Sequence, residues 1–482
     1  MERQGPTLAL PMSVAVPAFA PLRYRSRAGR LALAASTIGS GLSLLDATVV
    51  NVALPTIGRD LHASLTGLQW TVNAYTLTLS AFLLLGGSLG DRLGRRRIFV
   101  VGVAWFAVAS VLCGLAPNVG VLIAARALQG VGAALLVPVS LALIEATFAE
   151  DDRSAAIGAW SGLGGLAAAI GPLVGGTLID AVSWRAVFLI NLPFAAVAIW
   201  LALRFVPETR GSSAGSEIDW WGATLAPVAL AGLVYGLSDG IEHGFGSAVA
   251  LPTLVGGAVA LVAFLIAEGR AASPLLPLRL FRSRTFSGAN VLTFVVYGAF
   301  GGALFLVPIQ LQQVLGYSPL SSGAALVPVT VVMLLLSPRV GRLMARTGAR
   351  LPMTVGTVGI AVGLAWLSTI GRASSYATGV LPAVLVFALG LVTLVAPLTS
   401  TVLASVGLDF VGVAAAVNND LARIGGLVAV AVLPGLAGIA GSDYQHPAVF
   451  SAGYSTALRI AAVICAAGAV VAFTTIADVR RR

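Results

Sequence analysis

Long apolar stretches dominate the chain and limit its fold more than any other feature. A helix needs about 20 apolar residues to cross roughly 30 Å of hydrocarbon, and fourteen segments of the 482-residue sequence meet this requirement. Within a bilayer only helices and closed barrels satisfy their own backbone hydrogen bonds, and stretches of this length indicate helices. The sequence therefore predicts an all-α polytopic membrane protein. The predicted spans are 31–55, 67–90, 98–116, 119–144, 155–180, 186–206, 221–238, 248–268, 287–313, 322–344, 352–370, 378–405, 411–438 and 457–477.

Composition excludes several classes of protein. Only 10% of the residues are charged, against about 25% in soluble domains. The net charge of +10 is the difference between 29 cationic residues, all of them arginine, and 19 acidic ones. Most of the arginines lie in short loops between apolar stretches. This distribution is typical of membrane topology and not of a nucleic-acid-binding face. We therefore expect a lipid bilayer around the chain and no nucleic-acid partner. Because no loop is long enough for a catalytic domain, and the three histidines and two cysteines are scattered along the chain, we also expect no catalytic residues, no metal site and no enzymatic activity.

The arginines also predict an orientation. With the N-terminus in the cytoplasm, the cytoplasmic segments carry arginine clusters, whereas the opposite loops hold only Arg59, Arg185, Arg372 and Arg459. Cytoplasmic loops are enriched in arginine and lysine, so we expect a multi-pass protein of the cytoplasmic membrane with both termini in the cytoplasm. Residues 1–29 are expected to be a cytoplasmic tail and not a cleaved signal peptide, because Pro11 and Pro17 interrupt its apolar run. Met12 as the true first residue is an open alternative.

Two loops resemble each other and indicate a duplication. GSLGDRLGRR (Gly87–Arg96) and GRLMARTGAR (Gly341–Arg350) share Gly, Leu, Arg, Gly and Arg at the same offsets, after spans 2 and 10. Duplicated bundles are common among transporters, and a distance of eight spans fits two halves of six with spans 7 and 8 inserted between them. The predicted divisions are a tail over 1–29, a six-helix bundle over 30–206, a linker with the inserted helices over 207–285, a second bundle over 286–478 and a tail over 479–482.

Asp46 is the most informative single residue. It lies in an apolar span, where an ionised carboxylate costs about 2.5–3.5 kcal/mol even on insertion-based scales. At 1.5 Å per residue it lies about 13 Å below the far end of span 1, and Arg126 lies about 10 Å into span 4. Burial favours a neutral carboxyl group and a nearby guanidinium favours the ionised one, so a carboxylate whose arginine contact changes could load and release a proton. A static ion pair is the alternative interpretation.

Three other polar or glycine-rich groups suggest function, each with a simpler alternative. The loop residues Asp91, Arg92 and Arg95 predict either a conformational latch or topology alone. GPLVGG (Gly171–Gly176) in span 5 predicts a bend or ordinary close packing. Span 13 is the most polar of the second half and predicts a water-lined path or a locally paired Asp420 and Arg423. Residues that could line a substrate cavity are Asn51, Gln69, Trp70, Asn73, Tyr75, Gln129, Gln310, Asn418, Asn419, Asp420 and Arg423.

Together these motifs resemble the major facilitator superfamily, in its fourteen-helix drug/proton antiporter branch (EmrB/QacA type). LDATVVNVALP (Leu45–Pro55) resembles the first-helix motif of that branch, GSLGDRLGRRR (Gly87–Arg97) the loop motif of the superfamily, and RALQGVGAA (Arg126–Ala134) its fourth-helix motif. The antiporter motif of the fifth helix is matched except that Ala167 replaces one glycine. Its matching residues are Gly158, Gly171, Pro172, Gly175 and Gly176.

The resemblance implies two six-helix bundles that rock around a central cavity, with two inserted helices. It implies export of amphipathic small molecules in exchange for protons, with no other cofactor. Asp46 and Arg126 would couple protons, the loop residues Gly87, Asp91, Arg92, Gly94 and Arg95 would form the latch, and the fifth-helix glycines with Pro172 would form the bend. A carrier of a narrower physiological solute and a non-transporting receptor or scaffold remain alternatives, and a monomer is one option for the oligomeric state.

Overall fold

The computed structural model describes residues 21–211, 220–271, 276–407 and 410–476, without the side chains of residues 345 and 346. Most of the predicted N-terminal tail and all of the C-terminal tail lie outside these ranges. The described residues form fourteen helices that are long and apolar enough to cross a membrane. The all-helical prediction is therefore confirmed.

Six spans precede the inserted pair. They comprise α1 (Arg27–Asp60), α2 (Leu65–Leu93), α3 (Arg95–Gly114), α4 (Val119–Thr147), α5 (Glu150–Ala181) and one broken span, α6 (Ala186–Leu189) with α7 (Asn191–Phe205). Side chains cap several of these helices: Ser26, Ser64 and Asn118 accept hydrogen bonds from the backbone N–H groups three residues further on. Such caps satisfy donors that the first turn leaves free.

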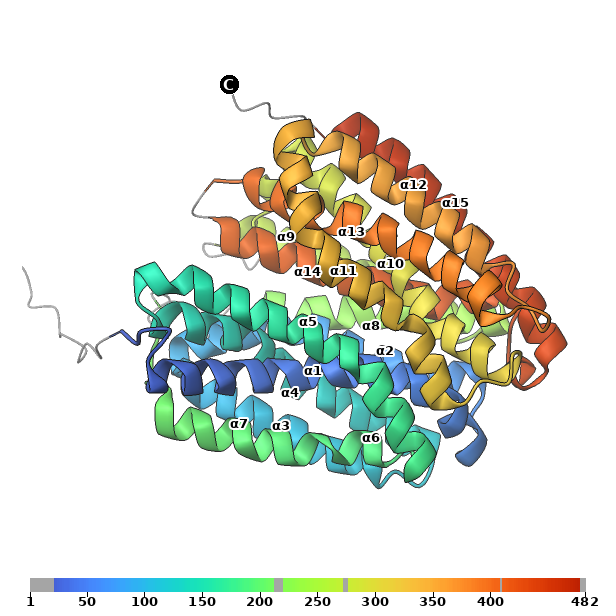
Figure 1. Cartoon of the computed structure of the whole chain (residues 1–482), viewed down its shortest axis with the longest axis horizontal. Coiled ribbons are helices and arrows are strands. Elements are labelled where there is room, and N and C mark those ends of the chain that lie inside the picture. Colours follow the sequence, from blue (N-terminus) through green and yellow to red (C-terminus); the bar gives the residue numbers. More distant parts are fainter. Residues whose placement is uncertain (1–20, 212–219, 272–275, 408–409, 477–482) are drawn as a thin grey trace, which may run out of the picture.

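The remaining helices form the inserted pair and the second half. The pair is α8 (Trp220–His243) and α9 (Ala250–Arg270), followed by the short η2 (Leu278–Arg282). The second half comprises α10 (Arg284–Gln313), α11 (Pro319–Thr347), α12 (Arg350–Leu367), η3 (Tyr376–Val380) with α13 (Leu381–Ala404), α14 (Val411–Leu436), η5 (Asp443–Gln445) and α15 (Pro447–Thr475). In Figure 1 the two halves lie beside each other, each built of side-by-side helices.

Several helices are longer than the apolar stretches predict. The last span was expected from residue 457, but α15 begins at Pro447. Span 1 was expected to end at residue 55, but α1 continues to Asp60, so Arg59 lies in its last turn and not in a loop. The reason is that the hydrocarbon sets only a minimum length, and polar turns beyond it remain helical where they are capped or packed. The predicted domain boundaries are not tested by these helix bounds and stay a prediction.

The two halves are in contact at one end of the molecule. We call the end where α1 begins and α2 finishes the arginine-rich end. The described residues form their hydrogen bonds between the halves near the opposite end: Leu65 N–H donates to Gly441 O, the Tyr444 hydroxyl to Ala63 O, and Leu320 N–H to Asp180 Oδ2. In Figure 1 the halves meet at the right and diverge toward the left, where α5 begins.

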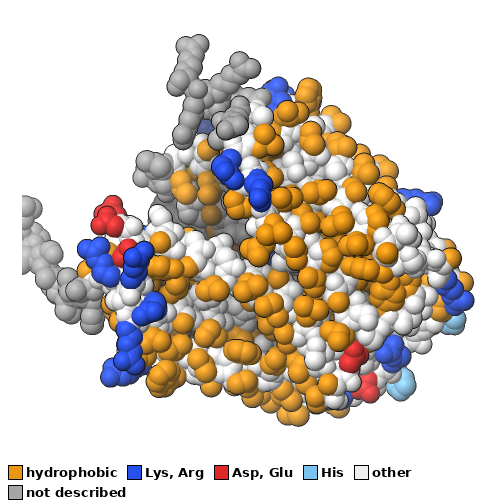
Figure 2. All heavy atoms as spheres, in the orientation of Figure 1, with side chains coloured by type: hydrophobic (Ala, Val, Ile, Leu, Met, Phe, Trp, Pro, Cys, Tyr) orange, Lys and Arg blue, Asp and Glu red, His pale blue; other side chains and the backbone are white. Residues whose placement is uncertain are grey.

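The surface agrees with a membrane setting. On the face shown in Figure 2, hydrophobic side chains cover the middle of both halves and charged side chains gather toward the ends. Large apolar residues are exposed on many helices, with Val108 63% and Leu334 63% exposed. In water such a surface would aggregate, whereas in a bilayer it faces lipid.

Candidate functional site

Asp46 of α1 and Arg126 of α4 meet inside the first half. Arg126 Nη1 lies 2.5 Å from Asp46 Oδ2, and the two side chains are 1% and 0% exposed. The contact expected from their equal depth is therefore present. Whether the pair couples protons is not tested by this contact.

The carboxylate is held on both oxygens. Gln129 Nε2 donates to Asp46 Oδ1 at 3.0 Å, and Asn191 Nδ2 approaches the same oxygen at 3.4 Å. Gln129 Oε1 in turn accepts from Arg126 Nη1 at 2.7 Å. Ser110 Oγ accepts from both amides, at 3.2 Å from Gln129 and 3.0 Å from Asn191. Four helices, α1, α3, α4 and α7, thus converge on one carboxylate.

Aromatic rings close off the guanidinium. The ring centre of Tyr75 lies 4.3 Å from Arg126 Cζ and that of Phe188 lies 5.8 Å from it. Arg126 Nε donates to Thr71 O at 3.1 Å, so the cation interacts with both π-faces and a carbonyl. Tyr75 Oη lies 2.6 Å from Ser43 Oγ, which links this ring back to α1.

Sequence reasoning missed part of this network. Gln129 and Tyr75 were expected near a cavity, but Ser43, Ser110, Phe188 and Asn191 were not singled out. A single serine or asparagine in an apolar span is common, because neighbouring helices satisfy its hydrogen bonds at small cost. The available signal was Asn191 within WRAVFLINLP, a segment that resembles the antiporter branch.

The loop Gly87–Arg97 contacts its own half and the segment that follows α7. Asp91 Oδ1 accepts from Arg95 Nε at 2.8 Å. Gly94 ends α2 with φ of +112°, a left-handed conformation that favours glycine. Glu208 was not predicted; it accepts from the N–H groups of Arg96 and Arg97 at the start of α3, where the helix dipole favours an anion. Gly348, at the corresponding position of the loop Gly341–Arg350, also ends its helix, α11, with a positive φ, of +80°. A latch between the halves remains a prediction.

The glycines of α5 pack against both halves. A Cβ at Gly171 would contact Thr48 of α1, and one at Gly175 would lie 2.6 Å from Val49 Cγ1. A Cβ at Gly176 would instead meet the backbone of Leu320 in α11, and Gly323 of α11 lies equally close to the backbone of Pro172. Close approach of helices at small residues is typical of membrane proteins.

We expect Gly176→Ala to destabilise the protein by about 1–3 kcal/mol, because the methyl group would force α5 and α11 apart. Thermal unfolding of the purified protein in detergent measures the change. Gly158→Ala is the matched control on the same helix, since no atom lies within 4 Å of its added Cβ and alanine favours a helix by roughly 0.5–1 kcal/mol over glycine. Equal stability of the two variants would contradict the close contact.

The polar residues of α14 do not form the local pair that their spacing allows. Asp420 and Arg423 form no ion pair with each other among the described residues, and Asp420 Oδ1 is buried without a hydrogen-bond partner there. Asn418 Nδ2 donates to Thr293 Oγ1 at 2.6 Å and to Asn290 Oδ1 at 3.1 Å, which joins α14 to α10. Asn418 and Asn419 also line a cavity of about 70 Å³.

The other cavity candidates lie in different settings. Gln310 is fully buried in the second half, where its amide donates to Ile370 O and Ser451 Oγ. Asn51 donates to Ala47 O of its own helix. Trp70 packs against Tyr235 of α8 with ring centres 5.5 Å apart. The structure therefore brings Asp46, Arg126, Tyr75 and Gln129 together and leaves these three elsewhere.

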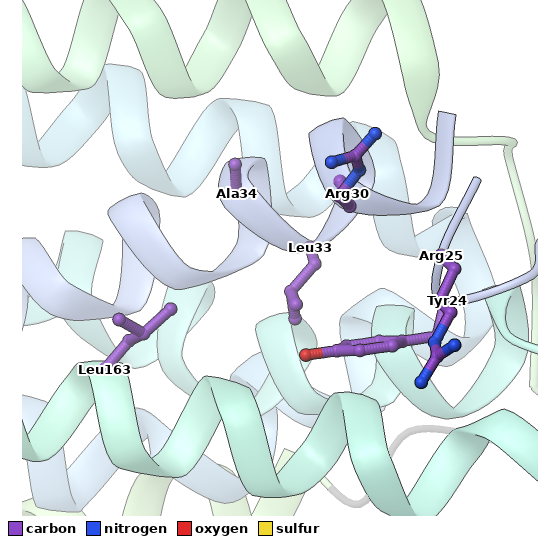
Figure 3. A pocket seen from close by; sticks show the side chains of 6 residues that line it. All are labelled: Tyr24, Arg25, Arg30, Leu33, Ala34 and Leu163. Carbon is purple, nitrogen blue, oxygen red and sulfur yellow. The ribbon is translucent and has the colours of Figure 1, made fainter. Parts of the chain in front are cut away.

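A larger hollow lies at the arginine-rich end. It has a volume of about 370 Å³ and lies between the starts of α1 and α5. Figure 3 shows its lining residues, Tyr24, Arg25, Arg30, Leu33, Ala34 and Leu163. Leu33 precedes Asp46 by thirteen residues, or about 20 Å along a helix, so this hollow is separate from the buried ion pair.

Comparison with known proteins identifies the family. The model of the Major Facilitator Superfamily matches residues 36–430. The chain belongs to this superfamily. Major facilitator proteins transport solutes across membranes, and this chain is accordingly a transporter and not an enzyme.

Resistance and export proteins are among the most similar relatives. The chain is 37% identical to the tetracenomycin C resistance and export protein of Streptomyces glaucescens, covering 83% of this chain and 74% of that one. It is 39% identical to the puromycin resistance protein pur8 of Streptomyces alboniger, covering 81% and 78%. Among solved structures, a bacterial homologue of the human lysosomal transporter Spinster matches with a TM-score of 0.68 and 16% identity, covering 94% and 97%. This last likeness concerns the fold.

Proposed function

We propose that this major facilitator protein exports amphipathic drugs or toxic small molecules across the cytoplasmic membrane in exchange for protons. The observation that carries the coupling is the buried ion pair of Asp46 and Arg126 at the junction of four helices. A scaffold gains nothing from two buried charges, and intramembrane ionisable residues commonly mark proton or substrate paths. Export is supported by the resistance and export functions named for the relatives.

Asp46 would exchange a proton between the two sides. When the carboxylate takes up a proton from outside, the pair loses its negative charge, and Arg126 keeps Gln129 Oε1 and Thr71 O as acceptors. When the proton leaves toward the cytoplasm, the ion pair forms again. A change of helix packing that alters the Asp46–Arg126 contact would thereby couple proton movement to the position of the halves.

The halves would alternate between two openings. With the arginine-rich end and both termini in the cytoplasm, the present contacts close the outer end. At the arginine-rich end, an added Cβ at Gly158, Gly162 or Gly165 of α5, or at Gly341 of α11, would meet no atom within 4 Å. These faces therefore have space around them, as an inward-open state requires.

A compound screen tests this proposal. Cells that lack their own efflux pumps are grown with panels of amphipathic compounds, with and without this chain. We expect raised tolerance to several compounds, and pH-gradient-driven efflux of the same compounds from proteoliposomes. Unchanged tolerance together with an altered metabolite profile would favour a narrower physiological solute, and no substrate-dependent proton movement would remove the coupling.

A further inference from the structure

Two glutamine side chains hold the contact between the halves. Gln69 Nε2 of α2 donates to Val430 O of α14 at 2.7 Å, and Gln312 Nε2 of α10 donates to Val52 O of α1 at 3.0 Å. Both side chains are buried, at 6% and 8% exposure. Hydrogen bonds of this kind stabilise the state in which this end is closed.

Asn73 lies in the same contact but forms no such bond. It follows Gln69 by four residues and precedes Leu77 by four, so the three side chains share one face of α2. Gln69 bonds to α14, and Leu77 packs in one cluster with Leu427 and Ala431 of α14. Asn73 is 0% exposed, and neither its Nδ2 nor its Oδ1 has a hydrogen-bond partner among the described residues.

A second unpaired group lies nearby on α8. Thr66 donates to Glu242 and Trp70 packs against Tyr235, so α2 and α8 run antiparallel in contact. In this alignment Ser238 lies near the level of Gln69, between the two contacts, and its hydroxyl is buried without a partner in the described part of the chain. The contact of α2, α8 and α14 thus contains polar groups that the closed state leaves unsatisfied.

We propose that Asn73 destabilises the closed contact between the halves and so keeps the transporter able to leave this state. A buried amide without partners costs free energy that an amide in water does not. When α2 and α14 separate, Asn73 becomes hydrated, so its presence favours the separated state, whereas Gln69 favours the closed one. This inference rests on the alternating openings proposed above.

Paired substitutions test it, because they should act in opposite directions. Asn73→Leu replaces the amide with an apolar group of similar size, and Gln69→Leu removes a bond across the contact. Spin labels at Arg59→Cys and Ser442→Cys, both exposed positions of the closed end, report the separation of the halves in a background with Cys113→Ala and Cys465→Ala. Pulsed electron–electron double resonance then gives the ratio of closed to separated molecules in nanodiscs across a range of pH.

We expect Asn73→Leu to raise the closed-to-separated ratio by roughly 5- to 150-fold, and Gln69→Leu to lower it. Asn73→Ala gives the same direction as Asn73→Leu and serves if the leucine variant does not fold. An unchanged or lowered ratio in both Asn73 variants would overturn the inference. A single distance in every sample would remove the alternating openings and the inference with them, whereas a shifted ratio without any efflux would support the inference and contradict only the proposed export.

Discussion

Replacing Asp46 with asparagine should abolish proton-driven efflux while leaving folded protein in the membrane. Asparagine keeps one oxygen, which can accept from either Arg126 or Gln129, but it cannot bind and release a proton. Breaking a buried ion pair typically costs about 3–5 kcal/mol, and we expect a smaller loss because Arg126 retains Gln129 Oε1, Thr71 O and the Tyr75 ring. Efflux driven by a pH gradient in proteoliposomes should fall to the level of empty vesicles.

Asp46→Glu is the matched control, since it keeps the titratable group and changes only its reach. We expect its efflux to be reduced, by up to about 100-fold for a displacement near 1 Å, but still dependent on the pH gradient. Gel filtration and thermal unfolding establish that both variants are folded. Full gradient-driven efflux by folded Asp46→Asn would show that another group couples the protons.

The sequence predicted the spans and the central pair well, because each depends on one strong physical constraint. Hydrocarbon thickness makes the apolar stretches visible, and helical rise converts position in a span into depth. Asp46 and Arg126 were found because a charge in such a stretch has a high energetic cost. The surrounding Ser110 and Asn191 carry no such cost, so the apolar pattern of their own spans did not distinguish them before the helices were placed.

The side of a helix to which a side chain points was harder to predict than its depth in the membrane. Gln310 and Gln312 are two residues apart and therefore point to nearly opposite sides of α10. Gln310 bonds within the second half, whereas Gln312 crosses to Val52 of the first. Asp420 and Arg423 share a helix face yet do not pair among the described residues. The sequence pattern also does not indicate which end of the molecule is closed, because the two proposed states are built from the same helices.

Removing Arg126 should have a larger effect on stability than removing Asp46, and the double variant should show why. In Arg126→Leu, buried Asp46 keeps only the amide donors of Gln129 and Asn191. We therefore expect the free energy of unfolding to fall by an amount near the upper end of the usual 3–5 kcal/mol. In Asp46→Asn with Arg126→Leu no buried charge remains unpaired.

The double variant should therefore be more stable than the sum of the single losses predicts, by roughly 0.5–3 kcal/mol of interaction energy. Thermal unfolding of all four proteins in the same detergent gives this energy, and none of the three variants should move protons with substrate. Arg126→Lys tests the shape of the cation, since lysine keeps the charge but not the several N–H groups that reach Asp46, Gln129 and Thr71 together. Additive losses in the double variant would mean that the two charges are stabilised by their other partners and not by each other. Protonation of Asp46 would then not change the packing of α1 against α4.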